Sequence, residues 1–157
     1  MEQAPTSKRT QAWRMLGSLG LLAYLLAVVK MTLLPLPPTS GWFSGMHQPR
    51  VLWELNLIPF DSYGSRQLLG NLILGIPFGI LLPLAVRWST RRLAITCAVF
   101  GVVIESCQLL LAFASGGFYR SVDVTDAILN GAGALIGLGA VLLARGLSRR
   151  RPPLDQD

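Results

Sequence analysis

The chain has 157 residues, of which 52% are hydrophobic and only 14% are charged, and its formal net charge is +6. Soluble globular domains carry about 25% charged residues, so this deficit favours an integral membrane protein. The positive balance does not indicate nucleic-acid binding. The basic residues stand beside long apolar runs, where the cytoplasmic charge bias of membrane proteins accounts for them. We therefore expect the lipid bilayer as a partner, and no nucleic acid.

The chain begins with a polar segment, residues 1–12, which we predict to be a disordered N-terminus. Four apolar runs of about 20 residues follow, which is the length that a helix needs to cross a hydrocarbon core of about 30 Å. They lie at about 13–34, 67–86, 93–114 and 124–144, and a basic tail, 145–157, ends the chain. The sequence therefore predicts an all-α integral membrane four-helix bundle, which forms one unit over residues 13–144.

The distribution of basic residues predicts how the bundle is oriented. Ten of the 14 lysines and arginines lie before or at the start of the first run, in the short connection between the second and third runs, and in the tail. Lysine and arginine collect on the cytoplasmic side of multi-pass membrane proteins. We therefore predict that both termini are cytoplasmic and that the loops 36–66 and 115–123 face outward.

The most informative single residue is Glu105, which lies inside the third apolar run. A carboxylate at that depth costs roughly 2.5–3.5 kcal/mol on insertion scales, so it is a functional-site hypothesis by default. At about 100° per residue, small residues share its helix face, and membrane helices pack through small residues. We therefore expect Glu105 to face the other helices. The small residues on its face are Ala94, Ala98, Gly101 and Ala112.

Other polar residues are expected to lie near Glu105. Their positions along the runs, at 1.5 Å per residue, place them all toward the outer end of the bundle, whereas the inner half is almost purely apolar. This asymmetry predicts an outward-facing polar pocket rather than a channel through the whole membrane. The candidate ligand-binding residues are Asn71, Gln108 and Asn130 within the runs, and Arg120 and Asp123 just outside them; Asp126 joins Glu105 as a candidate acid or base.

Purely structural roles stay open for several of these residues. Asn71 and Asn130 could simply hydrogen-bond one helix to another, and Asp126 could cap the start of the fourth helix. Arg120 could be an interfacial anchor or an ion-pair partner of Asp123. The pairs Gly75/Gly79 and Gly133/Gly137 have the small-xxx-small spacing, and their coincidence with the polar faces predicts close helix contacts there.

The sequence predicts no cofactor and no metal site, because it holds no Ser–His, Cys–His or metal-ligand constellation. If the pocket is catalytic, Glu105 or Asp126 would be the general acid or base. The residues themselves specify no reaction.

Four motifs, in this order, resemble the VanZ-like family, which is named for a teicoplanin-resistance membrane protein. The resemblance covers about residues 56–137 and implies a bacterial inner-membrane protein of the cell envelope. It carries over the polar pattern at the candidate residues named above, and it implies a link to glycopeptide resistance but no particular reaction. The motifs are NLIPF (Asn56–Phe60), NLILGIPFG (Asn71–Gly79), ESCQ (Glu105–Gln108) and RSVDVTDAILNGAG (Arg120–Gly133).

Three functions are compatible with these observations. In the first, the outer pocket binds or processes a lipid-linked or anionic envelope precursor, with Arg120 contacting an anionic group. In the second, the chain is a non-catalytic scaffold, and its polar faces hold the bundle together or join it to a membrane protein partner. In the third, it is a small proton-coupled carrier that uses Glu105, although no inverted repeat is visible between its halves.

Overall fold

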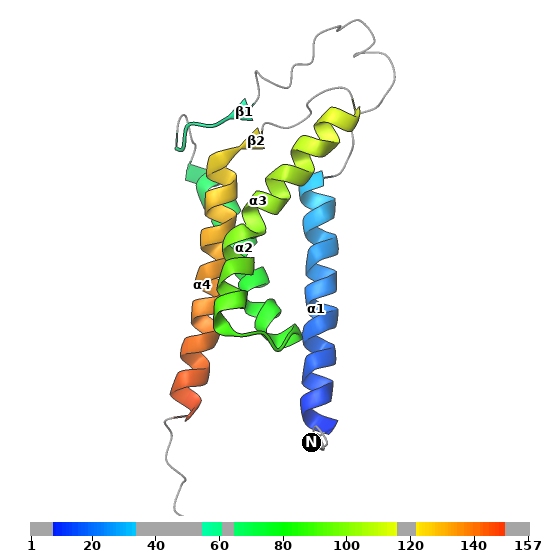
Figure 1. The fold of residues 1–157 in the computed structure, drawn as a ribbon, viewed down its shortest axis with the longest axis vertical. Helices are drawn as coiled ribbons and strands as arrows, with labels where there is room; N and C mark the ends of the chain where they lie inside the picture. Colours follow the sequence, from blue (N-terminus) through cyan, green and yellow to red (C-terminus); the bar gives the residue numbers. More distant parts are fainter. Residues whose placement is uncertain (1–7, 34–54, 61–64, 116–121, 150–157) are drawn as a thin grey trace, which may run out of the picture.

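The computed structural model describes residues 8–33, 55–60, 65–115 and 122–149. Its architecture is four long helices packed side by side, with a two-residue parallel strand pair at one end (Figure 1). In chain order the elements are α1 (Lys8–Leu33), β1 (Leu55–Asn56), α2 (Ser65–Ala85), α3 (Thr90–Ser115), β2 (Val122–Asp123) and α4 (Val124–Arg149).

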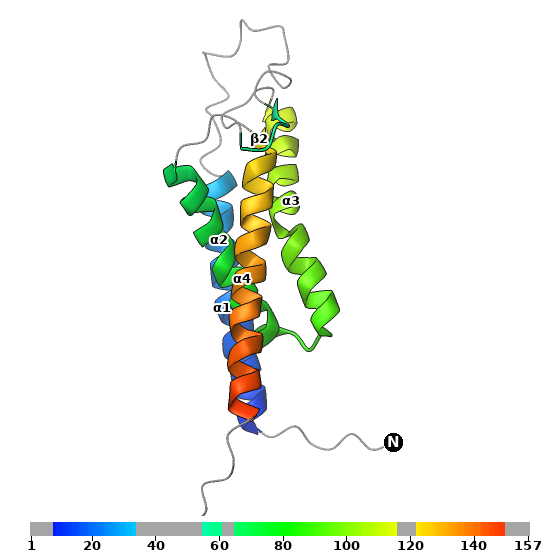
Figure 2. The same cartoon turned by 90° about the vertical axis from the view of Figure 1, so that its left-hand side faces the viewer.

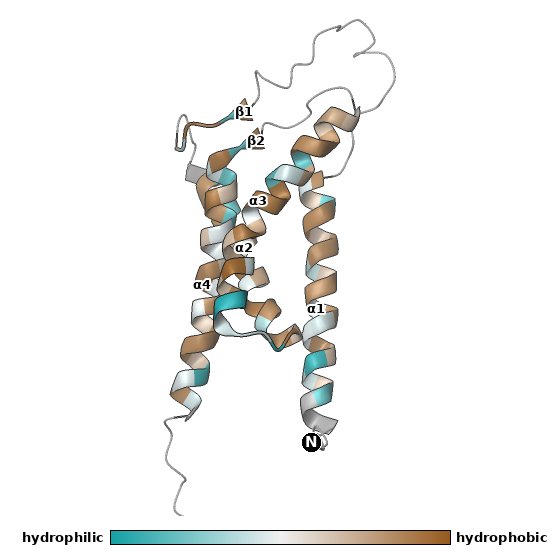
Figure 3. Cartoon of the chain, viewed as in Figure 1, coloured by the Kyte–Doolittle hydropathy of each residue, from teal (hydrophilic) through white to brown (hydrophobic). Residues whose placement is uncertain are grey.

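All four helices are long and apolar enough to cross a membrane, so the chain is a multi-pass membrane protein with four candidate spans. A helix suits this setting because it satisfies its own backbone hydrogen bonds where no water is available. Figure 3 shows hydrophobic residues along most of each helix, with hydrophilic residues near the helix ends and in the half of α3 nearest the strands.

The helices extend beyond the predicted apolar runs. α1 is helical from Lys8 onward, within the segment 1–12 that we expected to be disordered, and α4 continues to Arg149, into the predicted tail. The physical reason is that polar residues such as Lys, Arg and Gln have good helix propensity, so a spanning helix continues into them after it leaves the apolar region. The apolar runs in the sequence therefore mark the part of each helix that can lie in the membrane, and not the residues at which the helix ends.

Helix α4 is the centre of the bundle. It contacts α2 most extensively and α3 next, while α1 packs mainly on α2. Figure 2 shows α4 between α2 and α3. The N-terminal end of α1, the connection between α2 and α3, and the C-terminal end of α4 all lie at the end opposite the strands (Figure 1).

Close glycine contacts explain why α2 and α4 pack so tightly. A Cβ placed on Gly75 or Gly79 would overlap the backbone carbonyl of Asn130 or Ala134, respectively. The reverse is also true, since a Cβ on Gly133 or on Gly137 would overlap the backbone of α2. Only glycine therefore permits this helix spacing, and the close contacts predicted from the two small-xxx-small pairs are confirmed.

An apolar core fills the middle of the bundle. The rings of Phe78 on α2 and Phe100 on α3 stack with their centroids 4.0 Å apart, beside the buried Leu138 of α4. Tyr24 of α1 donates a hydrogen bond from its hydroxyl to the carbonyl of Leu74, which ties α1 to α2. Several bulky residues of α3 are exposed on the surface of the bundle: Val99, Val103, Leu110 and Phe113.

Candidate functional site

A polar cavity of about 290 Å³ lies between the four helices in the half of the bundle nearest the strands. We call it the polar cavity. Every helix contributes at least one polar side chain to it, because the strand-side ends of all four helices meet there. Its lining residues are Thr32 of α1, Gln67, Asn71 and Leu74 of α2, Ile104, Glu105 and Gln108 of α3, and Asp126 and Asn130 of α4.

Glu105 is buried and faces the interior of the bundle. One of its carboxylate oxygens, Oε2, accepts a hydrogen bond from the backbone N–H of Asp123 at 3.2 Å. Glu105 therefore lines the polar cavity and at the same time holds the segment that leads into α4. The expectation that Glu105 faces the other helices is therefore met. Of the small residues expected on its face, Gly101 and Ala112 are buried and Ala94 is half-buried, whereas Ala98 is exposed.

Two amides connect the cavity across helices. Asn71 of α2 donates a hydrogen bond from Nδ2 to Oδ1 of Asp126 on α4. Gln108 of α3 donates from Nε2 to the carbonyl of Thr32 at the end of α1, at 3.4 Å. These bonds fix the positions of the side chains around the cavity, and each of them joins two helices that are far apart in the sequence.

Asn130 differs from the other lining residues in its hydrogen bonding. Its side chain is almost completely buried, with 1% of its surface exposed, and its Oδ1 has no hydrogen-bond partner among the described residues. A buried acceptor left in this state costs about 1–3 kcal/mol. Oδ1 of Asn130 can therefore accept a hydrogen bond from a donor that enters the polar cavity.

Asp123 lies beside the cavity rather than in its lining. Its Oδ2 accepts a hydrogen bond from Asn56 of β1 at 2.8 Å, and its Oδ1 accepts one from the backbone N–H of Thr125 at 2.7 Å. The second bond is a helix cap, since Thr125 is in the first turn of α4. Both oxygens of this carboxylate are thus engaged within the protein.

The strand pair forms a cover over this end of the bundle. Leu55 pairs with Val122 and Asn56 with Asp123 in a parallel register. The hydroxyl of the buried Thr125 accepts a hydrogen bond from the backbone N–H of Phe60 at 2.9 Å, and Phe60 has a positive φ of 62°. The segment after β1 is therefore anchored to the start of α4, next to Glu105.

Sequence reasoning missed three residues of this region: Thr32, Asn56 and Thr125. Asn56 lies in the first of the four motifs, which was a usable signal. Arg120, the predicted contact for an anionic group, lies outside the described residues.

The cavity suits hydrogen bonding more than metal binding. Across the described parts of the chain, no group of three His, Cys, Asp or Glu residues is close enough to hold a metal ion. Its lining instead combines two carboxylates with several amide groups, and none of the described lining side chains is basic. Such a surface presents mainly acceptors, so it can bind hydroxyl, amide or ammonium donors.

The pattern of the VanZ/LLP1 family matches residues 21–145. A curated relative, Protein VanZ of Enterococcus faecium, is 31% identical over 125 residues, which cover 77% of this chain and 71% of that protein. No solved structure matches the chain at a significant level. The family match covers α2 and α3, most of α4, the second half of α1 and every lining residue of the polar cavity, so this chain belongs to the VanZ/LLP1 family.

Proposed function

We propose that this chain is a protein of the bacterial inner membrane whose polar cavity binds the head group of a lipid-linked envelope molecule. The observation that carries this proposal is Oδ1 of Asn130, a buried acceptor without a described protein partner that lies in a cavity with two carboxylates. Hydroxyl and amide donors, such as those of a sugar or a peptide, would satisfy these acceptors.

The location of the cavity supports an amphipathic ligand. The polar groups lie between membrane-spanning helices, and the surfaces of those helices are apolar. A lipid-linked molecule could leave its chain among these apolar surfaces while its head group occupies the polar cavity. If a reaction follows binding, Glu105 or Asp126 would transfer the proton. An anionic group on the ligand would be a partner for Arg120.

We propose further that both termini are cytoplasmic and that the polar cavity faces outward. The charge bias of the sequence supports this orientation. The arrangement of the ends is consistent with it, because the N-terminal end of α1 and the C-terminal end of α4 lie together, away from the strands (Figure 1). The polar cavity would then be reached from the periplasmic side, where envelope precursors are assembled into the wall.

The variant Glu105→Gln tests the binding function. Gln can still accept the N–H of Asp123, so the fold should be kept, but the carboxylate is lost. Hydrogen bonds to a charged group contribute about 1.5–3 kcal/mol, so retention of a lipid-linked molecule should fall about tenfold or more. The measurement is mass spectrometry of the lipids that stay with the purified protein.

Ser106→Ala is the matched control, because Ser106 is the adjacent residue, is exposed and does not line the cavity. Teicoplanin susceptibility of cells that express each form is a second measurement and tests the proposed link to glycopeptide resistance. Equal lipid retention by wild type and Glu105→Gln, at normal protein levels, would contradict the proposed function. A stoichiometric membrane partner that co-purifies with a fully tolerated Glu105→Gln would favour the scaffold instead.

A further inference from the structure

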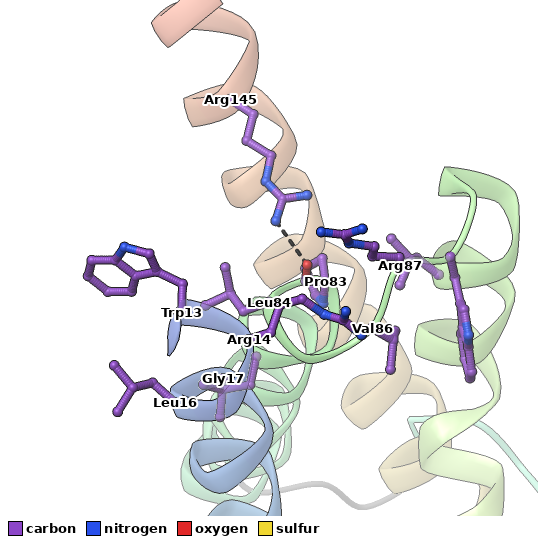
Figure 4. Close-up of a pocket in the computed structure, with 12 residues that line it drawn as sticks. Trp13, Arg14, Leu16, Gly17, Pro83, Leu84, Val86, Arg87 and Arg145 are labelled. Carbon is purple, nitrogen blue, oxygen red and sulfur yellow. Dashed lines mark hydrogen bonds between the residues drawn. The ribbon is translucent and has the colours of Figure 1, made fainter. Parts of the chain in front are cut away.

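A second, larger cavity of about 570 Å³ lies at the opposite end of the bundle, away from the strands. Three arginines from three different elements line it: Arg14 of α1, Arg87 just after α2, and Arg145 of α4. We call it the arginine cavity. Figure 4 shows the three side chains directed toward the C-terminal end of α2.

The described lining of the arginine cavity contains no Asp or Glu. Three guanidinium groups that share one cavity repel each other, and an anion placed between them would offset that repulsion. Arg145 donates one hydrogen bond, from Nη2 to the carbonyl of Pro83 at 2.9 Å, which caps the end of α2. A guanidinium has five N–H donors, so this bond fixes the orientation of Arg145 and uses only one of them.

The positive-inside rule alone would explain basic residues at this end. It does not require that they converge, because arginines that serve only as topology signals can extend into water anywhere along the interface. Here the chain offers a contrast: Arg91 and Arg92, at the start of α3, are also exposed at this end but do not line the cavity. The convergence of the other three arginines therefore indicates a binding site.

The remainder of the lining is apolar and open to the surface of the bundle. Trp13 and Leu16 on α1 and Leu84 on α2 are 64%, 59% and 41% exposed, so the wall of the cavity continues into the lipid-facing surface of the helices. A free inorganic anion would gain nothing from this wall, whereas an acyl chain would pack on it. The volume is within the range of about 300–1,000 Å³ that is common for small-molecule sites.

We propose that the arginine cavity binds one anionic glycerophospholipid of the adjoining leaflet. Its phosphate lies among Arg14, Arg87 and Arg145, which can bind phosphate oxygens bidentately. Its acyl chains lie along the apolar wall, and Trp13 and Trp88 sit at the level of the head groups, as interfacial aromatic residues do. The site is separate from the polar cavity and does not depend on the function proposed for it.

The test is lipid binding by the purified protein in nanodiscs of phosphatidylcholine that contain a minor fraction of phosphatidylglycerol. Native mass spectrometry measures how strongly one phosphatidylglycerol molecule is retained relative to phosphatidylcholine. Arg14→Gln/Arg87→Gln removes the charge-assisted hydrogen bonds that two of the arginines make to the phosphate, so it should lower the preference for phosphatidylglycerol about tenfold or more. Arg145 is left intact because it also caps α2.

Arg91→Gln/Arg92→Gln is the matched control, since it removes the same charge at the same end of the bundle and should leave the preference within about twofold of wild type. An equal loss in both variants would show a general surface-charge effect and would overturn the proposal. Displacement of phosphatidylglycerol by inorganic phosphate would also overturn it, because it would identify a site for a soluble anion.

A second experiment does not require the variants to fold. Photoactivatable phosphatidylglycerol, with the reactive group next to its head group, is added to the wild-type protein. Crosslinks should map to residues 13–17, 81–88, 93 or 145, the four parts of the chain that meet at the arginine cavity. Crosslinks spread evenly over all four helices, or concentrated at the strand end, would overturn the proposal.

Discussion

The carboxylate of Asp123 joins three separate parts of the chain. It accepts hydrogen bonds from Asn56 and from the backbone of Thr125, while its own N–H donates to Glu105. Because Asp123 is 5% exposed, these bonds are shielded from competing water. The residue thus links the strand pair, the start of α4 and the acid of α3, and the wall of the polar cavity depends on it.

Asp123→Asn should destabilise the protein by about 1–3 kcal/mol, because one of the two acceptor oxygens becomes an amide that faces another donor. The measurement is the unfolding midpoint in detergent. Asn56→Ala removes the partner of the same hydrogen bond. The double variant should therefore lose little more stability than the more destabilised of the two single variants. Strictly additive costs would show that the bond between Asn56 and Asp123 contributes nothing to stability.

Helical geometry was sufficient to predict five of the polar residues that line the polar cavity. The helical angle and the position along each apolar run predicted from the sequence that these residues lie together, and all five line the polar cavity: Asn71, Glu105, Gln108, Asp126 and Asn130. Their roles in binding or proton transfer stay predictions.

The contacts of Asn56 and Thr32 could not be predicted in the same way. Asn56 and Asp123 are 67 residues apart and belong to short strands, where a period of 3.6 residues does not apply. Thr32 meets Gln108 through its backbone carbonyl, which leaves no trace in the pattern of side chains.

The pair α2 and α4 determines the shape of the bundle. At Gly79, an added Cβ would overlap the carbonyl oxygen of Ala134, and the rigid backbone of α4 cannot move aside locally. Gly79→Ala should therefore separate the two helices and lower the free energy of unfolding by about 1–3 kcal/mol, as overpacking does. The unfolding midpoint in detergent measures the effect.

Gly139→Ala is the control for this prediction, since nothing lies within 4 Å of a Cβ at that position of α4. The change should be neutral or slightly stabilising, because Ala has a higher helix propensity than Gly by about 1 kcal/mol. If both variants behaved alike, close packing between α2 and α4 would not be the source of the effect.

The number of helices and their approximate positions followed from apolar run length, because the bilayer sets a minimum length for a span. The strand pair was not predicted. Two residues per strand, Leu55–Asn56 and Val122–Asp123, give no alternating pattern long enough to recognise. The pair exists because both segments are anchored beside the start of α4, which is a consequence of tertiary structure.

The two cavities lie at opposite ends of the molecule, with the apolar core between them. The stacked rings of Phe78 and Phe100 and the buried Leu138 and Cys97 occupy that middle layer. The two cavities share no lining residue.

The proposed orientation of the whole molecule has a direct test. Alkaline phosphatase fused to the C-terminus should be inactive, and green fluorescent protein at the same place should be fluorescent, because both termini are expected in the cytoplasm. Phosphatase inserted between α3 and β2, within residues 116–121, should be active, since that loop is expected outside. Immunoblots control for expression of each fusion.

An active phosphatase at the C-terminus would show that the orientation is the reverse of the proposed one. The polar cavity would then face the cytoplasm and could not receive a periplasmic envelope precursor, and the arginine cavity would lie in the outer leaflet, against the charge rule that predicted the orientation.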